Sequence, residues 1–238
     1  MSISVVMPVY NEEETIEQIV RECLTEIVSR IDVSELIVVN DGSTDSTAEI
    51  LGRLAKEFPL LRVVSLEQNS GHSKALRVGF SKAKSRLILH IDSDNKFLAE
   101  DFWKLYSHAE DNDIVLGCRV SRHDRLHRRI ISSAARIINA AIFGLFIKDA
   151  NSPFKLIRKN VLDDVLGDIS ENAFVISILI LIAAKYKGYR IAEVPVNNLA
   201  RMEGKSKLSS PFSLLRGCFL SFCDIVLLKR RLLSRKHR

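Results

Sequence analysis

The sequence lacks the features that mark several classes of protein. Its 238 residues contain four cysteines, none in a Cys-x-x-Cys pair, which is typical of reduced thiols in a cytosolic protein. No basic leader precedes the first apolar run, so we expect no signal peptide. No internal repeat or low-complexity segment occurs. The hydrophobic fraction of 47% and the charged fraction of 27% exclude a disordered chain and a collagen-like one.

Long hydrophobic runs are also missing. The longest uncharged apolar runs, residues 137–147 and 173–184, are shorter than the roughly 18–20 residues that a membrane span needs. The segment 211–228 is longer, but Arg216 and Asp224 interrupt it. We therefore expect no transmembrane helix.

Excess positive charge is concentrated at the carboxyl end. The formal net charge is +6, and residues 228–238 hold six cations and no acid. A basic end suits an anionic partner, either lipid headgroups or nucleic acid. Nucleic acid is disfavoured, because the basic residues lack interleaved aromatic residues and no recognition motif occurs. An anionic membrane surface is therefore the expected partner.

Short apolar runs alternate with helical periodicity over the first 117 residues. The expected strands are residues 3–7, 36–40, 62–66, 87–91 and 114–117, and the expected helices are 12–30, 44–57, 73–83 and 100–110. Apolar strands separated by helices of about ten or more residues indicate an α/β fold with a parallel sheet covered on both faces. Ligands of such sheets bind at the carboxyl ends of the strands.

The second half of the chain has a different composition. Residues 119–136 contain six arginines and one acid, which is typical of a solvated helix face or of a helix in the headgroup region of a membrane. The elements expected after them are an apolar helix at 137–147, a loop at 149–153, a strand at 154–157, a helix at 174–185, strands at 190–194 and 196–199, a basic loop at 201–210 and a terminal helix at 212–231.

Polar loops follow the first, second and fourth expected strands. They read Pro-Val-Tyr-Asn-Glu-Glu at 8–13, Asn-Asp-Gly-Ser-Thr-Asp at 40–45 and Asp-Ser-Asp at 92–94. A carboxylate just past a buried strand, as at Asp41 and Asp92, is costly to desolvate unless it binds a cation or accepts hydrogen bonds. Asp92 and Asp94 can hold Mg²⁺ or Mn²⁺ on a diphosphate. Each loop alone is also typical of an ordinary turn or helix N-cap, but the three in this order are more specific.

These motifs resemble those of the family 2 glycosyltransferases, which have the GT-A nucleotide-diphospho-sugar fold. The residues that carry the resemblance are 5–12, 37–45, 92–94 and the segment 71–79. Two later stretches are similar to the branch of dolichyl-phosphate mannose synthase and other polyprenyl-phosphate glycosyltransferases. They are Asp-Ala-Asn-Ser-Pro-Phe-Lys at 149–155, and Glu-Val-Pro-Val at 193–196 followed by Arg-Met-Glu-Gly-Lys-Ser-Lys at 201–207. The resemblance covers about residues 3–208 and implies an α/β fold with a mostly parallel central sheet.

The resemblance also implies an organisation for the whole chain. It places a GT-A domain at 1–210, with a nucleotide-sugar-binding half at 1–117 and an acceptor half at 118–210, followed by an amphipathic basic helix and tail at 211–238. Apolar residues in that helix recur at three- to four-residue steps, which suits a membrane interface. We expect a cytoplasmic protein, peripheral on the cytoplasmic face of the membrane. An ordinary core helix or a homodimer contact is the alternative for this helix.

A role is implied for each matching position. Pro8, Tyr10 and Glu12 are implied to line the nucleoside, and Asp41 to accept a hydrogen bond from the base. Lys74 is implied to contact the donor nucleotide. Asp92 and Asp94 are implied to hold the divalent ion, Mg²⁺ or Mn²⁺, and the donor diphosphate. Arg119, Arg128 and Ser132 are implied to grip the donor or the acceptor phosphate. The basic loop with Arg201, Lys205 and Lys207 is implied to lie over the leaving diphosphate. Asp149 is implied to lie near the acceptor.

The implied reaction is inverting transfer of a sugar from a GDP- or UDP-sugar to dolichyl or undecaprenyl phosphate. A lipid phosphate is already anionic at neutral pH, so it needs guanidinium groups rather than a general base. One alternative is a glycan or glycolipid hydroxyl acceptor in cell-surface polysaccharide synthesis, which would need a base such as Asp149. The other is a non-catalytic nucleotide-sugar-binding protein.

Some positions depart from the family pattern. Lys96 stands where relatives often carry Gln, and Pro153 replaces the usual Gly of the acceptor loop. Relatives commonly show an acid where this chain has Val175 and Ile176. The six histidines have no metal-ligand spacing, and His90 is expected to pack rather than to act.

Overall fold

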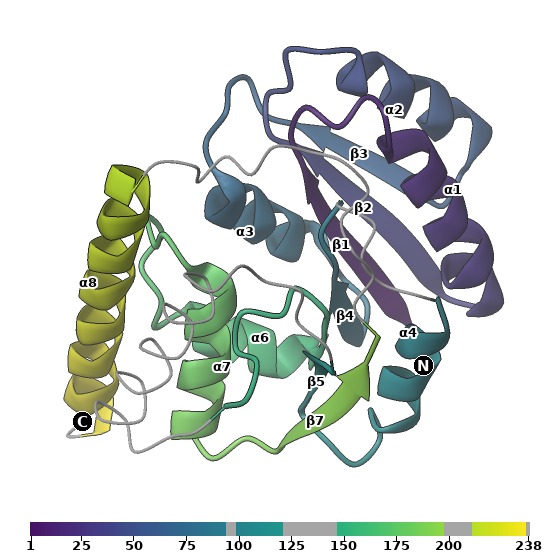
Figure 1. Cartoon of the computed structure of the whole chain (residues 1–238). Helices are drawn as coiled ribbons and strands as arrows, with labels where there is room; N and C mark the ends of the chain where they lie inside the picture. Colours follow the sequence, from purple (N-terminus) through teal and green to yellow (C-terminus); the bar gives the residue numbers. More distant parts are fainter. Residues whose placement is uncertain (94–98, 121–146, 198–210, 237–238) are drawn as a thin grey trace.

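A seven-stranded sheet forms the centre of the computed structural model, which describes residues 1–93, 99–120, 147–197 and 211–236 (Figure 1). The strands are β1 (Ile3–Val9), β2 (Ser34–Asn40), β3 (Leu61–Ser65), β4 (Leu87–His90), β5 (Ile114–Arg119), β6 (Lys155–Arg158) and β7 (Ile191–Val196). Their order across the sheet is β3-β2-β1-β4-β6-β5-β7. Strand β6 runs antiparallel to both neighbours, and the other adjacent pairs are parallel. The structure thus confirms an α/β fold with a mostly parallel sheet.

Helices cover both faces of the sheet. One face carries α1 (Ile16–Glu26), α2 (Thr47–Glu57) and α4 (Ala99–Ser107), and the other carries α3 (His72–Lys82), α6 (Lys159–Leu166) and α7 (Ile176–Tyr186). Successive side chains of a strand point to opposite faces, so Val5 and Met7 of β1 join the first core while Val6 joins the second. Gly79 lets helix α3 lie close to β1. A Cβ at this position would collide with the Val6 side chain.

Several elements differ from their expected bounds. The helix expected at 12–30 is α1 followed by a 3-10 turn, η1 (Val28–Arg30). Helix α6 was not predicted from the sequence. It has only eight residues and follows β6 directly, so no loop residues separate the two elements. The two strands expected around Pro195 are the single strand β7, which lies at the edge of the sheet, where proline is tolerated. The helix expected at 137–147 and the loop at 201–210 lie outside the described residues, apart from Ile147.

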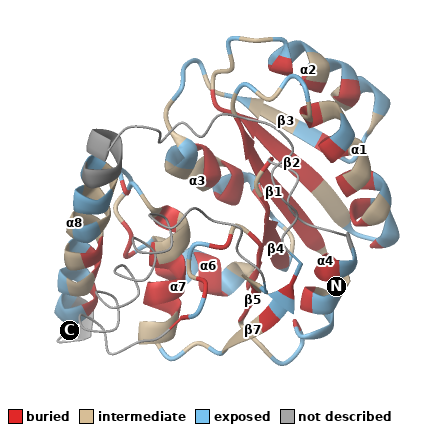
Figure 2. Ribbon diagram, in the orientation of Figure 1, coloured by how far each residue is buried: buried red, intermediate tan, exposed pale blue. Residues whose placement is uncertain are grey.

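The terminal helix α8 (Pro211–Lys236) packs along α7 (Figure 1). Its residues Ile225, Leu228 and Leu232 recur at three- and four-residue steps and are buried in the core of α3, α6 and α7. Figure 2 shows this buried side facing α7, with the opposite side exposed. No helix among the described residues has the length and apolar character that crossing a bilayer would require.

Candidate functional site

Hydrogen bonds join the loops that follow β1 and β2. Asn11 has a positive φ of 54°, a conformation that Asn adopts more readily than most residues. Its Oδ1 accepts a hydrogen bond of 2.8 Å from the backbone N–H of Thr44. The backbone N–H of Asn11 donates to Ser43 Oγ at 3.0 Å, and that of Glu12 donates to Thr47 Oγ1 at 2.9 Å. These bonds fix both loops at the carboxyl edge of the sheet.

Residues expected to line the nucleoside lie on elements that meet at this edge. Pro8 is buried within β1, opposite Val39 of β2. Tyr10 and Glu12 follow it in the partly exposed loop. Lys74 is exposed in the first turn of α3. Their contacts with a nucleotide stay predictions.

Asp41 is buried at the end of β2, with 2% of its surface exposed. Its Oδ1 accepts the backbone N–H of Ser70 at 2.8 Å, and its Oδ2 accepts that of Gly71 at 2.9 Å. Gly42, with a φ of +65°, has no room for a Cβ, because the backbone of Gln68 passes against it. Asp41 therefore holds the segment that leads into α3, and each carboxylate oxygen keeps a second lone pair for a ligand.

Asp92 lies just beyond β4 and meets two histidines. Its Oδ1 is 3.3 Å from Nε2 of His90, the last residue of β4, and 3.7 Å from Nε2 of His72, the first residue of α3. His90 is buried, as the sequence predicts, and the Phe80 ring meets it edge-on. No spacing in the sequence predicts this cluster, because His72 and His90 are distant in sequence and only the packing of α3 beside β4 brings them together.

Burial and charge set the protonation of this cluster. Burial lowers the pKa of His90 to about 4, against the opposing effect of the Asp92 carboxylate. Burial alone would raise the pKa of Asp92, but the His90 and His72 rings outweigh it and hold that pKa below its usual range. At neutral pH the site therefore presents a neutral His90 imidazole beside an ionised carboxylate, which are the protonation states that a cation binds.

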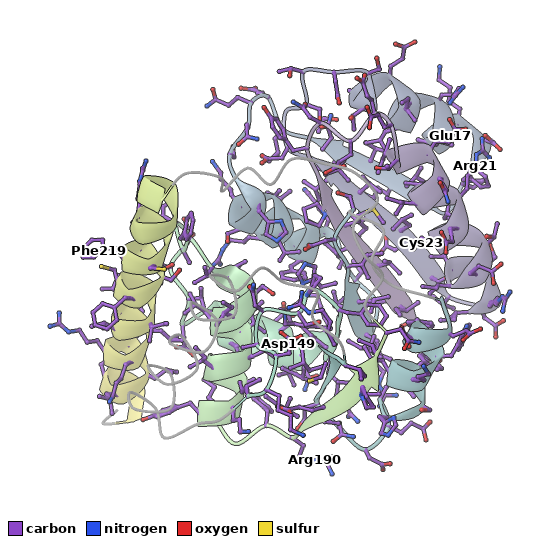
Figure 3. All side chains as sticks on the ribbon, viewed as in Figure 1. Glu17, Arg21, Cys23, Asp149, Arg190 and Phe219 are labelled. Atoms are coloured by element: carbon purple, nitrogen blue, oxygen red, sulfur yellow. The ribbon has the colours of Figure 1, made fainter. Side chains whose placement is uncertain are left out.

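Arg119 and Asp149 form a bidentate ion pair in the body of the molecule, where Figure 3 labels Asp149. The Nε of Arg119 donates to Asp149 Oδ2 at 2.8 Å, and Nη2 donates to Oδ1 at 2.9 Å. The backbone N–H of Arg119, at the end of β5, also donates to Oδ2 at 3.3 Å. Asp149 is 4% exposed, so this pair is largely shielded from solvent.

Lys155, the last residue of the stretch 149–155, is fully buried. It stands opposite His90 in the β4–β6 register. Its Nζ donates to Ser177 Oγ at 2.6 Å and to the carbonyl of Ser152. Burial lowers the pKa of Lys155 to about 7, although Asp92 and Asp149 raise it. A lysine among apolar strand residues was the sequence signal for this position.

The start of α7 is tied to both neighbouring helices. Ser73 of α3 donates from Oγ to the carbonyl of Phe174 at 2.6 Å and accepts the N–H of Ile176 at 3.2 Å. From α8, Asp224 Oδ2 accepts the N–H groups of Phe174 and Val175 at 2.7 and 3.4 Å. The residues around Val175 include no acid at the start of α7. Asp224 of α8 supplies a carboxylate there instead.

Other predicted site residues lie outside the described part of the chain. They are Asp94, Arg128, Ser132, Arg201, Lys205 and Lys207, as is the divergent Lys96. Among the described residues, Asp92, His72 and His90 form the group that fits a divalent cation. No hydrogen bond in the described part of the chain reaches Oδ1 of Asp92 or either ring nitrogen of His90, so these atoms suit an ion.

Comparisons with known proteins identify the family and the fold. The model of glycosyl transferase family 2 matches residues 4–175. The undecaprenyl-phosphate 4-deoxy-4-formamido-L-arabinose transferase of Salmonella choleraesuis (strain SC-B67) is 32% identical over 212 residues, which is 87% of this chain and 62% of that protein. The transferase of the same name from Salmonella typhimurium (strain LT2) matches with the same identity and coverage. This chain spans less than two thirds of the length of these relatives.

Solved structures of glucosyl-3-phosphoglycerate synthase from Mycobacterium tuberculosis share the fold. The complex with Mn²⁺, UDP and phosphoglyceric acid has a TM-score of 0.70 at 24% identity and covers 97% of this chain and 78% of that one. The complex with Mg²⁺ and UDP has a TM-score of 0.69 at 24% identity, with coverage of 93% and 79%. Since its sequence matches the family over most of its length and its sheet has the GT-A arrangement, this chain belongs to glycosyl transferase family 2.

Proposed function

We propose that this chain transfers a sugar from a nucleoside diphosphate sugar to a polyprenyl phosphate at a membrane surface. Family membership supports sugar transfer, and the names of its undecaprenyl-phosphate transferase relatives support a polyprenyl phosphate acceptor. The motifs at 149–155 and 193–207 favour the same acceptor.

The observation that carries the choice of acceptor is the pair of Arg119 and Asp149. A hydroxyl acceptor needs a general base, and Asp149 is the acid that the sequence offers for that purpose. Both of its oxygens instead accept hydrogen bonds from the Arg119 guanidinium, so the carboxylate is already engaged in an ion pair. An acceptor that is already ionised needs no base, so this geometry favours a phosphate.

The proposed reaction is a single displacement. An oxygen of the lipid phosphate forms a bond to the anomeric carbon, and the bond from that carbon to the diphosphate breaks, with its electron pair leaving on the nucleoside diphosphate. The anomeric configuration inverts. No proton has to leave the acceptor. The protein therefore has to position two phosphates and neutralise their charge.

We divide these tasks between the two halves of the chain. We assign the nucleotide to the edge formed by the loops after β1 and β2, with Tyr10, Glu12, Asp41 and Lys74, beside Pro8 in the strand. Asp92 and Asp94 would hold Mg²⁺ or Mn²⁺, which supplies positive charge to the leaving diphosphate. The cations assigned to the phosphates are Arg119, Arg128, Arg201, Lys205 and Lys207, with Ser132 as a hydrogen-bonding partner.

We assign membrane contact to the outer side of α8. Phe219 is 67% exposed, and Phe222, Leu227 and Leu233 are exposed as well. Figure 3 shows Phe219 on the side of α8 that faces away from the body. Basic residues at 229–231 lie on the same helix. Apolar side chains flanked by cations suit the headgroup region of an anionic membrane, which supports a peripheral enzyme whose acceptor is a membrane lipid.

The test is turnover of radiolabelled GDP- and UDP-sugars with undecaprenyl phosphate in detergent, with Mg²⁺, Mn²⁺ or chelator, beside Asp92→Ala. We expect one donor to label the lipid, in a reaction that requires both the metal and Asp92. A donor that is bound or hydrolysed while no sugar labels the lipid contradicts the proposed acceptor. Transfer to a glycan hydroxyl would then be favoured, and binding without turnover would favour a non-catalytic protein.

A further inference from the structure

Two imidazoles and a carboxylate converge where β4 ends and α3 begins. The ligand atoms of His72, His90 and Asp92 all lie within 4.8 Å of one another. Asp92 Oδ1 is 3.3 Å from His90 Nε2 and 3.7 Å from His72 Nε2. Around an ion with ligands at about 2.1 Å, two ligands at right angles are about 3 Å apart. The two separations from Asp92 are therefore close to that of neighbouring ligands on one ion.

Among the described residues, the buried atoms of this cluster have the contact between His90 Nε2 and Asp92 Oδ1 but no hydrogen bond of good geometry. Within the described residues, no hydrogen bond reaches Nδ1 or Nε2 of His90 or Oδ1 of Asp92, although His90 is 1% exposed. Buried polar atoms are nearly always hydrogen-bonded or bound to a water or ion. A cation between the rings and the carboxylate would satisfy His90 Nε2 and Asp92 Oδ1 together. His72 is exposed at the rim, where an ion would still be open to a substrate.

We propose that His72, His90 and Asp92 form one side of a mixed nitrogen–oxygen metal site that selects Mn²⁺ or another first-row transition ion over Mg²⁺. Imidazole suits transition ions, whereas Mg²⁺ prefers oxygen ligands. Three protein ligands on one side leave positions for oxygens of a nucleoside diphosphate, a step that rests on the function proposed above. The preference for a transition ion follows from the two imidazole rings. The Asp-Ser-Asp motif alone supplies only oxygen ligands, which would suit Mg²⁺ as well.

The direct test is pulsed electron paramagnetic resonance of the full chain, free of any histidine tag and loaded with Mn²⁺, with and without UDP. We expect electron spin-echo modulation from directly bound imidazole nitrogen in the wild type. His72→Asn should remove part of that modulation, and His108→Asn, a change at an exposed histidine on the other face of the sheet, should leave it unchanged. His72 is exposed, so its replacement should not disturb folding. A Mn²⁺ signal without nitrogen modulation in both conditions overturns the proposal.

Metal affinity gives a second readout that does not depend on catalysis. We expect His72→Asn to weaken Mn²⁺ binding at least about tenfold, and to weaken Mg²⁺ binding far less. Equal losses for the two ions, or none for either, contradict selection by the imidazoles. Nitrogen modulation without transfer to any lipid would leave the metal site standing and refute the proposed function. Metal-dependent transfer to the lipid without nitrogen modulation would support the proposed function and refute the histidine metal site.

Discussion

At the residue scale, the carboxylate of Asp41 holds the segment that leads into α3. Asp41→Asn replaces one of its two acceptor oxygens with an amide that cannot accept the N–H of Ser70 or Gly71. We expect a loss of about 1–3 kcal/mol in the free energy of unfolding, measured by urea denaturation, together with weaker nucleotide binding. Asp32→Asn, at an exposed aspartate, is the matched control. Equal stability of both variants would show that these two bonds contribute little.

Lys155 gives a pH dependence with a definite sign. Its pKa is about 7 in the folded chain, against the ordinary value of 10.5 expected for the unfolded one. Between these values the unfolded chain binds more protons, so the stability should rise with pH, by up to about 1.4 kcal/mol per unit. Lys155→Met removes this titration. We expect urea denaturation in chelator, compared at about pH 7 and about pH 9, to show a flatter pH dependence for Lys155→Met than for the wild type.

The control for this experiment is Lys82→Met, because Lys82 is exposed at the end of α3. Its pH dependence should match that of the wild type. The contrary result is a free energy of unfolding that decreases from about pH 7 to about pH 9 in the wild type, when compared with Lys155→Met. It would mean that Lys155 stays charged, because its hydrogen bonds to Ser152 and Ser177 favour the ammonium more than burial opposes it.

At the scale of elements, α8 has two sides with different expected functions. Leu228 is buried against α7, so Leu228→Ala should lower the free energy of unfolding by about 2–5 kcal/mol. Phe219 is exposed, so Phe219→Ser should change stability by less than about 0.5 kcal/mol. The same Phe219→Ser change should weaken binding to phosphatidylglycerol-containing vesicles about tenfold, since it removes apolar area from the interface.

Vesicle sedimentation and urea denaturation of both variants check this division. Vesicles of phosphatidylcholine alone should bind the wild type more weakly, because the cations of α8 then lack anionic headgroups. Concentration-dependent dimers that Phe219→Ser abolishes, without any vesicle binding by the wild type, would instead assign this side of α8 to a second copy of the chain.

The start of α7 depends on a residue from another helix. Asp224→Ala should destabilise the protein by about 1 kcal/mol, because the backbone N–H groups of Phe174 and Val175 lose their side-chain acceptor. Thermal unfolding measures this effect. Asp163→Ala, at an exposed aspartate of α6, should have a smaller one. If the order of the two variants were reversed, Asp224 would not be acting as a cap.

At the scale of the whole molecule, the first half of the fold was predictable and the rest less so. The apolar runs of β1, β2 and β4 are continuous because these strands are buried on both faces, and that pattern identifies a covered parallel sheet. Apolar runs do not reveal direction, so the antiparallel course of β6 is a property of the assembled sheet. An apolar run also does not reveal which strands lie beside it in the sheet. The position of β6 between β4 and β5 was therefore not predictable from the sequence.

The candidate site also has a part that the sequence indicates and a part that it does not. Asp41 and Asp92 could be selected from the sequence because a carboxylate just past a buried strand requires a partner. The pairing of Arg119 with Asp149 and the approach of His72 to Asp92 depend on contacts between segments that are distant in sequence. Such contacts leave no local pattern. A buried lysine such as Lys155 differs from an exposed one only in its apolar neighbours, which is a weak signal.

The central claim is that the acceptor is already ionised, and one competition assay tests it most directly. The chain would be offered equal amounts of undecaprenyl phosphate and undecaprenol, the same lipid without its phosphate, with the labelled donor and Mn²⁺. Because Asp149 is held by Arg119 and no base is assigned to the acceptor, the account predicts label in the phosphate lipid alone. Label in the alcohol and none in the phosphate would contradict it.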